Sequence, residues 1–285
     1  MTLPHRTYLM CPPEYFEVSY AINPGMDPTA PVDPELAGKQ GQRLRETLVE
    51  LGHTVHELAP VPGLPDLVYA ANGGFVLDGV AYGARFRYPQ RAAEAAVHRA
   101  WYRESGARVV TPAEVNEGEG DLVWTGRSIL AGHGFRTGLA AHQEVRAVFG
   151  RPVVSLRLVD PRFYHLDTAL AVLDDAPQRD ASRFAGDPAD HSARIAYFPG
   201  AFSAASQRIL RQLFPDALVA DEADAAGFGL NVVSDGRQVV LNAEATGMAA
   251  KLARAGYTPV PVELSELKKG GGSVKCCVLE LRLSH

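Results

Sequence analysis

The sequence predicts an α/β protein in which five similar units stand around a common axis like blades. Hairpin signals recur along the chain with helical stretches between them. The unit of strand, helix and hairpin repeats about every 45 residues, with one longer interval, which is a period typical of circular arrays. Polar residues also recur in phase with this repeat. An ordinary α/β protein with several hairpins is the alternative, and the phased polar residues favour the array.

The N-terminal part of the chain is expected to supply a strand, a long loop, a helix and a second strand. Residues 7–11 read as a short buried strand, and the prolines and the length of the loop at residues 12–26 exclude a helix there. Residues 34–52 carry leucines at helical spacing and end at a glycine, which predicts an amphipathic helix. Residues 54–58 form the next predicted strand.

The hairpins are marked by apolar runs on either side of short turn sequences. Asp78-Gly79 gives a strong signal, because Asp-Gly suits a two-residue turn, and Asp174-Asp175 is expected to form the third turn. Residues 278–283 are expected to complete a fifth unit by pairing with the N-terminal strand. The other predicted hairpins occupy residues 75–82, 122–130, 169–175 and 232–241. The helices predicted between them occupy residues 91–104, 138–149, 203–213 and 245–255.

The composition is that of an ordinary globular protein, with 285 residues, 46% hydrophobic, 21% charged and a formal net charge of −5. We expect residues 1–285 to form a single domain, since closed folds of this size are common. No cluster of basic residues indicates nucleic acid as a partner, and no apolar run is long enough to span a membrane. The sequence leaves the formation of a homo-oligomer open.

The cysteines and the first residues indicate a reducing compartment. Residues 1–5 lack the basic and apolar pattern of a secretion signal, and three cysteines, two of them adjacent, make a poor disulfide framework. We therefore expect a cytoplasmic protein with free thiols. No Cys-x-x-Cys, His-x-x-x-His or His-Glu-x-x-His motif occurs, so no metal site is predicted.

The phased polar residues lie just before, or at the entry of, a hairpin strand in each unit. They are Asn72, Glu117, His165, Asn231 and Cys276. Equivalent positions of a radial array converge on its axis. These five side chains are therefore expected to meet in one central cavity, which is the main structural prediction from the sequence.

Cys276 lies where the glycine-rich turn 270–272 runs into an apolar strand. A thiol at such a junction can be reached by a ligand, whereas Cys277 is expected to fill the core. Two buried core cysteines are the alternative, because free cysteine is most often buried. As a thiolate, Cys276 would be the nucleophile in attack on an electrophilic carbon.

The expected partners of this thiol are an imidazole and carboxylates. His165 and Asp167 are two residues apart and would share one face of a strand, so Asp167 can orient His165 or bind a ligand beside it. His165 would protonate the leaving group and then activate water. Glu117 and Glu119 lie among glycines that allow a ligand to approach the backbone closely. A core histidine and a solvated acidic turn are the alternatives for these two segments.

Short motifs in a fixed order carry a resemblance that runs through nearly the whole chain. They are Met10-Cys11-Pro12-Pro13, Tyr20-Ala21-Ile22-Asn23-Pro24, Ala70-Ala71-Asn72-Gly73-Gly74, Glu117-Gly118-Glu119-Gly120-Asp121, Thr125-Gly126-Arg127, Phe135-Arg136-Thr137, His165-Leu166-Asp167-Thr168 and Gly271-Gly272-Ser273-Val274-Lys275-Cys276. With these motifs the sequence resembles the guanidino-group-modifying enzymes of the pentein superfamily, above all the dimethylarginine dimethylaminohydrolases and arginine dihydrolases. The resemblance implies a five-bladed α/β propeller, in agreement with the repeat.

The resemblance also implies a hydrolase with a covalent mechanism and without a metal or organic cofactor. Cys276 would attack the guanidinium carbon of L-arginine or Nω-methylated arginine, and His165 would protonate the departing amine. Water activated by His165 would then resolve the S-linked thiouronium intermediate. The products would be citrulline and ammonia or (di)methylamine, so the expected partner is a small guanidino substrate.

Two glutamates of this chain could match the catalytic carboxylate of the family. The run 117–121 needs a one-residue insertion relative to the family's acidic-x-Gly-Asp segment. Glu117 or Glu119 could therefore take the catalytic place. Glu117 is favoured, and Glu119 remains a substrate-binding candidate.

Arginines and asparagines are the implied substrate-binding residues. Arg136 matches the arginine that holds the substrate's α-carboxylate, a task that suits a bidentate guanidinium, and a surface ion pair is the alternative. Arg85 and Arg91 are lesser candidates for the same end of the substrate. Asn23 and Asn72 are the residues that arginine dihydrolases carry.

Asn72 departs from the deiminases and dimethylargininases, which place an acid there to clamp the guanidinium. An amide both donates and accepts hydrogen bonds, so it can bind a neutral ureido group as well as a guanidinium. The resulting hypothesis is that citrulline formed first is hydrolysed again. Arginine would then yield ornithine, two ammonia and carbon dioxide.

Two other functions remain open from the sequence. An amidinotransferase would resolve the intermediate with an amine instead of water. A non-catalytic propeller would only bind a ligand, although it would need neither the thiol nor the imidazole. The aromatic-rich loop at residues 12–26 is expected to close over the substrate as a lid.

Overall fold

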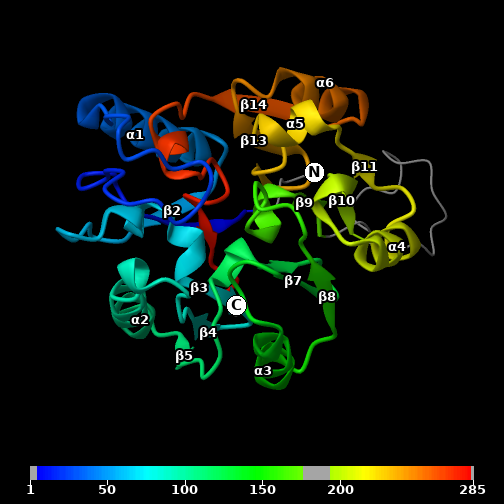
Figure 1. Cartoon of the computed structure of the whole chain (residues 1–285), viewed down its shortest axis with the longest axis horizontal. Helices are drawn as coiled ribbons and strands as arrows, with labels where there is room; N and C mark the ends of the chain where they lie inside the picture. Colours follow the sequence, from blue (N-terminus) through cyan, green and yellow to red (C-terminus); the bar gives the residue numbers. More distant parts are fainter. Residues whose placement is uncertain (1–4, 176–192, 284–285) are drawn as a thin grey trace.

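Five three-stranded sheets form a ring around a central axis in the computed structural model of the protein, which describes residues 5–175 and 193–283 (Figure 1). The helices lie towards the outside of the ring. The chain passes around it from the blue N-terminal unit to the red C-terminal segment, which returns to the centre. The prediction of five blades around an axis is confirmed.

Each sheet takes three strands, and its central strand is the second of the unit. The strands of the successive sheets are β15 (Leu279–Glu280), β1 (Thr7–Met10) and β2 (Thr54–Glu57); β3 (Gly74–Leu77), β4 (Val80–Gly83) and β5 (Arg108–Val110); β6 (Leu122–Trp124), β7 (Ile129–His133) and β8 (Val153–Arg157); β9 (Leu170–Asp174), β10 (Arg194–Tyr197) and β11 (Leu218–Val219); and β12 (Val233–Ser234), β13 (Gln238–Asn242) and β14 (Thr258–Val262). The α-helices are α1 (Pro34–Glu50), α2 (Glu94–Glu104), α3 (Leu139–Phe149), α4 (Ala204–Leu213), α5 (Glu222–Ala226) and α6 (Thr246–Arg254).

The same connections recur in all five sheets. The first strand of each unit pairs antiparallel with the central strand, and the third pairs parallel with it. Parallel neighbours need a crossover between them. In each unit that crossover contains a helix, namely α1, α2, α3, α4 or α6.

The turn between β3 and β4 shows why the hairpin signal is reliable. Asp78 and Gly79 have φ of 52° and 73°, the left-handed values that a two-residue hairpin turn requires. Leu77 and Val80 are therefore paired across the turn. The hairpins predicted at residues 122–130 and 232–241 are also observed.

The third predicted hairpin has a different connection. Asp174 is the last residue of β9, and β9 pairs with β10, which begins at Arg194. The predicted turn at Asp174-Asp175 is therefore wrong. This acidic pair contains no glycine for a tight turn, so Asp174 continues the strand. Most of the connection lies outside the described residues.

The two ends of the chain close the ring, as predicted. β15 pairs antiparallel with β1, with Leu279 opposite Leu9, and β1 also pairs parallel with β2. The segment that carries Cys276 directly precedes β15. Closure thus brings this late segment back to the first unit.

The predicted helices are observed with small shifts at their ends. The longest, α1, begins after Asp33, whose side chain accepts hydrogen bonds from the backbone N–H groups of Glu35 and Leu36. A proline follows this cap, where its fixed φ suits the first turn. Leu44 and Leu48 on the inner face of the helix are fully buried.

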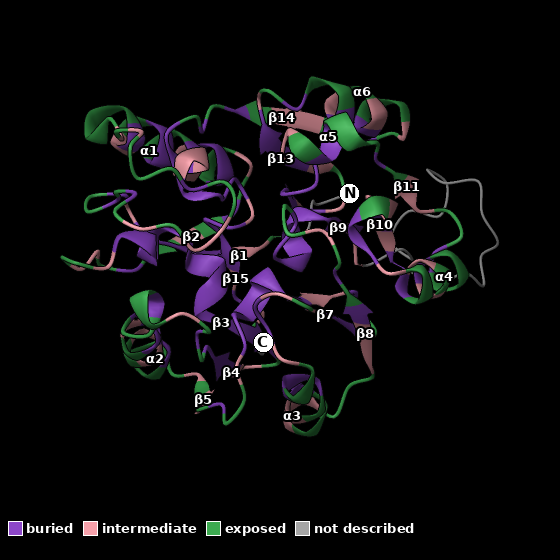
Figure 2. Ribbon diagram, in the orientation of Figure 1, coloured by how far each residue is buried: buried purple, intermediate pink, exposed green. Residues whose placement is uncertain are grey.

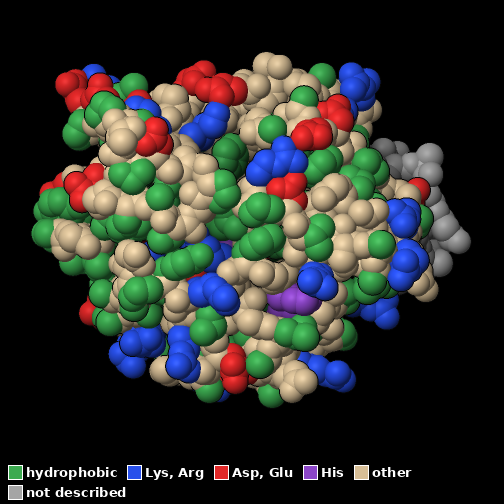
Figure 3. Space-filling view, viewed as in Figure 1, with side chains coloured by type: hydrophobic (Ala, Val, Ile, Leu, Met, Phe, Trp, Pro, Cys, Tyr) green, Lys and Arg blue, Asp and Glu red, His purple; other side chains and the backbone are tan. Residues whose placement is uncertain are grey.

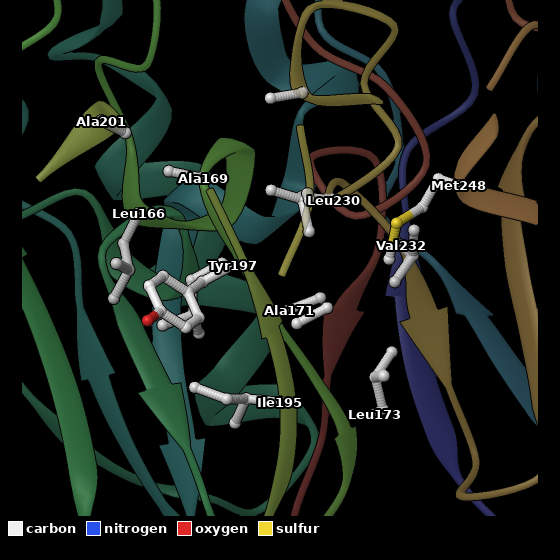
Figure 4. Packing of buried hydrophobic residues seen from close by; sticks show 14 of the residues in the cluster. Leu166, Ala169, Ala171, Leu173, Ile195, Tyr197, Ala201, Leu230, Val232 and Met248 are labelled. Carbon is white, nitrogen blue, oxygen red and sulfur yellow. The ribbon is translucent and has the colours of Figure 1, made fainter. Parts of the chain in front are cut away.

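Buried residues concentrate on the inner strands and on the turns nearest the axis (Figure 2). One large apolar cluster joins the third, fourth and fifth units, and Figure 4 shows Leu166, Tyr197 and Met248 among its members. Leu166 is fully buried there and directly follows His165. Packing of this leucine therefore anchors the turn that carries the imidazole.

The surface shows charged side chains of both signs interspersed over the face drawn in Figure 3. None of the helices in the described part of the chain is both long and apolar enough to cross a bilayer. Within residues 5–175 and 193–283, no group of three His, Cys, Asp or Glu side chains is placed to hold a metal ion.

Candidate active site

Short 3₁₀ turns carry or follow three of the phased polar residues, Asn72, Glu117 and His165. Asn72 lies in η2 (Ala70–Gly73) before β3, and the turns η4 (Gly118–Gly120) and η5 (Leu166–Thr168) lie before β6 and β9. The turn η4 contacts both η2 and η5. The turns that precede the first strands of these three units thus lie against one another, as the radial repeat predicts.

Gly120 shows how closely these turns approach. A Cβ atom at this position would lie 2.5 Å from Nδ2 of Asn72 and 3.2 Å from Cγ of His165. Only a glycine leaves room for the two side chains here. The amide and the imidazole therefore flank the same small space.

His165 and Glu117 form a hydrogen-bonded pair inside the protein. Nε2 of His165 lies 2.7 Å from Oε2 of Glu117, and both residues are almost fully buried. Burial opposes ionisation of Glu117, but Arg136 and the hydrogen bond with His165 outweigh it and lower the pKa of the carboxyl. The ionised carboxylate can therefore stabilise positive charge that develops on the imidazole during a reaction.

Arg136 binds the carboxylate of the His165–Glu117 pair. Its Nη1 donates to Oε2 of Glu117 at 2.8 Å, and its Nη2 donates to the carbonyl of Ile22 at 3.0 Å. The guanidinium lies between the rings of Tyr88 and Tyr164, 4.8 and 4.7 Å from their centroids. Arg136 is therefore a buried residue of the site and not a surface ion pair.

The thiol of Cys276 is buried beside Asp167. Its Sγ lies 3.4 Å from Oδ2 of Asp167, and Oδ1 of that carboxylate has no partner among the described residues. Burial raises the pKa of Cys276 well above its ordinary value, and the charge of Asp167 raises it further. Burial likewise raises the pKa of Asp167 from 3.8 to about 6. Burial and Asp167 therefore favour the protonated thiol of Cys276.

Tyr164 connects the imidazole side of the site with the cysteine side. Its ring lies 4.8 Å from that of His165, and its hydroxyl donates to the Gly271 carbonyl at 2.6 Å. The backbone N–H of Ala71 also donates to the Cys276 carbonyl at 3.1 Å. The thiol, the imidazole and the Asn72 turn thus belong to one constellation.

The orientation of Asn72 follows from its partner. Nη1 of Arg91 donates to Oδ1 of Asn72 at 2.7 Å. A guanidinium can only donate, so the amide oxygen must face Arg91 and the amide nitrogen must point elsewhere. This Nδ2 is buried, and within residues 5–175 and 193–283 it has no hydrogen-bond partner. Asn72 therefore presents a free donor beside His165.

Comparison with known proteins identifies the family. No family model matches the chain. The chain is 55% identical over 276 residues to the N(G),N(G)-dimethylarginine dimethylaminohydrolase of Mycobacterium tuberculosis, covering 97% of this chain and 86% of the relative. The chain belongs to the dimethylarginine dimethylaminohydrolase family. It is thus a member of a family of guanidino-modifying hydrolases.

The chain is also similar to part of an arginine dihydrolase. The chain is 34% identical to the bifunctional arginine dihydrolase/ornithine cyclodeaminase ArgZ of Synechocystis sp. over 96% of its length, but spans only 37% of ArgZ. The N-terminal domain of ArgZ, in a form with serine replacing an asparagine and covalently bound to a reaction intermediate, matches 98% of this chain with a TM-score of 0.87 and 32% identity, over 99% of that domain. A dimethylarginine dimethylaminohydrolase adduct with 18% identity shares the fold at a TM-score of 0.74, over 97% of this chain and all of the other.

Three of the residues that the family resemblance assigned to the substrate lie in other contacts. Glu119 pairs with Nζ of Lys275 at 2.7 Å and with Nη1 of Arg282 at 2.5 Å. Arg91 binds both oxygens of Glu94, at 2.8 and 2.9 Å, as well as Asn72. Arg85 is exposed and donates to a backbone carbonyl. These contacts favour Glu117 over Glu119 as the carboxylate that serves His165.

The loop at residues 12–26 contacts the site through several groups. Nδ2 of Asn23 donates to the Gly270 carbonyl at 3.1 Å, and its Oδ1 accepts from the backbone N–H of Gly25 at 2.9 Å. The neighbouring Ile22 carbonyl is the one that binds Arg136. The loop is therefore tied both to the glycine turn that precedes Cys276 and to Arg136.

Sequence reasoning missed a further acid of this constellation. Asp66 is buried, its Oδ2 accepts a hydrogen bond from the Tyr20 hydroxyl at 3.0 Å, and its Oδ1 has no partner among the described residues. Burial raises the pKa of Asp66, and Arg91 opposes this effect. Asp66 lies outside the phased positions, in a proline-rich segment that reads as a plain loop. Only its contacts reveal it.

Proposed function

We propose that this chain hydrolyses the guanidino group of L-arginine or an Nω-methylated arginine through a covalent intermediate on Cys276. The products are citrulline and ammonia, or citrulline and a methylamine. The single observation that carries the proposal is the arrangement at the axis. The segment that holds His165 against Glu117 also contacts the Cys276 thiol through Asp167 and the Gly271 carbonyl through Tyr164. Membership of the hydrolase family supports it.

The first half-reaction uses the thiol as nucleophile. The substrate's guanidinium lies against the carboxylate of Asp167, whose Oδ1 is available to accept from it. This cation offsets the negative charge that raises the pKa of Cys276, so bound substrate favours the thiolate. The thiol proton passes to solvent, the sulfur adds to the guanidinium carbon, His165 gives a proton to the departing nitrogen, and the C–N bond breaks. The product of this half is a thiouronium on Cys276.

The second half-reaction uses water. His165, now without its proton, accepts a proton from a water molecule that attacks the thiouronium carbon. The C–S bond breaks, the ureido product leaves, and the sulfur regains a proton from the hydroxyl group that the attacking water left on the carbon. Glu117 stabilises the positive imidazolium before the first step and after the second. The reaction involves no oxidation or reduction.

Arg136, Asn23 and Asp66 are proposed to hold the amino-acid end of the substrate. Arg136 uses two of its five donors in the observed contacts, so donors remain for an α-carboxylate. Asp66 offers an unpartnered carboxylate oxygen to a positive group. Asn23, with the loop at residues 12–26, would close over this end of the substrate.

Asn72 supports an extension of the reaction to ornithine. Its free Nδ2 can donate to the carbonyl oxygen of citrulline, whereas a carboxylate at this position could not. The same attack by Cys276 on the ureido carbon of bound citrulline would release a second ammonia and leave a thiocarbamate, which water would hydrolyse to ornithine and carbon dioxide. A relative named as an arginine dihydrolase supports this extension. No observation favours an amine acceptor or a purely binding role.

The test is a panel of arginine, citrulline, monomethylarginine, dimethylarginine and agmatine, with amino-acid analysis of the products. Consumption of arginine or methylated arginine, lost in Cys276→Ser, is the expected result. Accumulation of ornithine from arginine supports the extension, and a stop at citrulline contradicts it. Undiminished turnover by Cys276→Ser would overturn the assignment of the nucleophile.

A further inference from the structure

We infer that Asn231 is a further catalytic residue, whose side-chain amide orients the Cys276 sulfur and stabilises its thiolate. The inference rests on the proposed role of Cys276 as nucleophile. Asn231 is one of the phased axis residues, yet neither the family motifs nor the mechanism above give it a task. It is fully buried and lies just before β12 in the fifth unit.

The amide of Asn231 makes three hydrogen bonds, two of them to Cys276. Its Oδ1 accepts from the backbone N–H of Cys276 at 3.2 Å, and its Nδ2 lies 3.1 Å from Sγ of the same residue. The second hydrogen of Nδ2 is donated to the backbone carbonyl of Asp167, also at 3.1 Å. A backbone N–H must meet the amide oxygen and a backbone carbonyl must meet the amide nitrogen. These two contacts therefore fix which end of the amide faces the sulfur.

The sulfur consequently has a donor on one side and an acceptor on the other. Nδ2 of Asn231 donates to it, and Oδ2 of Asp167, at 3.4 Å, accepts from the thiol when the proton is present. When the proton leaves, the donor remains. A hydrogen bond made to the charged form of a group favours that form, and bonds to ionised groups are the stronger ones. Asn231 therefore opposes the two influences, burial and Asp167, that keep Cys276 protonated.

The amide also ties three successive units together at the sulfur. Asp167 precedes the fourth sheet, Asn231 the fifth, and Cys276 the strand that closes the ring. The backbone carbonyl of Asn231 additionally accepts from the N–H of Lys275 at 3.4 Å. An aspartate could not make all three hydrogen bonds, because a carboxylate has no N–H donors. An apolar residue of similar size could make none of them. The geometry thus selects an asparagine.

The experiment compares Asn231→Asp, Asn231→Leu and Asn231→Ser with a matched control, Asn242→Ala. Asn242 is an equally buried asparagine of the same unit, whose amide donates to the Gly227 carbonyl and accepts from the N–H of Glu244, away from the sulfur. The readout is the pH dependence of alkylation of Cys276 by iodoacetamide, followed on its own peptide by mass spectrometry. The kinetics with arginine are measured alongside, and thermal unfolding confirms that each variant is folded.

We expect Asn231→Asp and Asn231→Leu to move the pH midpoint of Cys276 alkylation upward by about one unit or more. The alkylation rate at neutral pH should fall at least tenfold, and kcat for arginine should fall with it while KM changes less. Asn231→Ser, which retains one hydroxyl donor, should be intermediate, and Asn242→Ala should leave the midpoint unchanged. A loss of stability alone would not move this midpoint.

An unchanged midpoint in a folded Asn231→Leu or Asn231→Asp variant would overturn the inference. If all larger changes prevent folding, Asn231→Ser decides the question by the same readout. Failure of the proposed function has a different signature. In that case the natural protein consumes no guanidino substrate, while the midpoint of Cys276 alkylation still depends on Asn231.

Discussion

The imidazole of His165 and the carboxylate of Glu117 meet at 2.7 Å although 48 residues separate them in the chain. They belong to two neighbouring units, and each lies at the entry turn of its first strand. Arg136 binds the same carboxylate oxygen at 2.8 Å. The repeat of the fold is therefore what assembles the proposed acid–base pair.

Replacing Glu117 by glutamine should lower kcat for arginine by about 100-fold or more, the lower end of the usual contribution of a positioned acid or base. Glutamine keeps the size of the side chain but cannot stabilise an imidazolium. The matched control is Glu119→Gln, whose carboxylate binds Lys275 and Arg282 instead of His165. We expect this control to lower the melting temperature and to affect kcat much less. Equal losses of kcat in both variants would contradict the assignment.

Replacing Asp167 by asparagine should stabilise the unliganded protein at neutral pH while abolishing turnover. The folded-state pKa of Asp167 is raised to about 6, so its contribution to stability is present below about pH 4 and is lost as the pH rises through 6. Asparagine avoids that loss, which for a shift of about two units amounts to roughly 3 kcal/mol near pH 7.

The measurement is chemical denaturation of both proteins at several pH values. The difference in free energy of unfolding should grow from near zero at pH 4 to its full value above pH 6. A variant that is less stable than the natural protein at pH 7 would show that Asp167 is not destabilised by burial.

Arg136→Lys should weaken selection of arginine over agmatine, which lacks the α-carboxylate. A lysine keeps the charge but loses the planar fork that can bind a carboxylate with two hydrogen bonds. We expect the ratio of kcat/KM for arginine to that for agmatine to fall at least tenfold, mainly through KM for arginine. Equal losses with both substrates would mean that Arg136 acts only by holding Glu117.

Asn72→Asp should uncouple the two hydrolytic rounds. A carboxylate still accepts from Arg91 and from a guanidinium, but it has no donor for the carbonyl oxygen of citrulline. The yield of citrulline from arginine should persist while ornithine falls at least tenfold, as measured by amino-acid analysis. Ornithine formation that survives this change would show that Asn72 does not recognise the ureido group.

The architecture could be predicted from the sequence because each unit carries its own local signals. Turns such as Asp78-Gly79 and the helical spacing of leucines act within a few residues, and repetition reinforces them. The turn wrongly predicted at Asp174-Asp175 shows the limit of this reasoning, since a long connection leaves no local signal.

The candidate site could be predicted only in part from the sequence. The phase of the repeat pointed to Glu117, His165 and Cys276 at the axis. The family motif, which needs a one-residue insertion here, left the choice between Glu117 and Glu119 open. That choice depends on partners from distant segments, such as Arg136 for the first and Arg282 for the second. The role inferred for Asn231 likewise needs coordinates, because an amide reveals its task only through what its two ends contact.

The most direct test of the account is to quench the protein with acid at short times after mixing with arginine and to measure its mass. The account predicts a transient adduct with the mass of arginine less ammonia, located by peptide mapping on Cys276 and absent from Cys276→Ser. Dimethylarginine, where it is a substrate, should give the same adduct, because dimethylamine leaves in place of ammonia. An adduct on any other residue, or normal turnover by Cys276→Ser, would contradict the account.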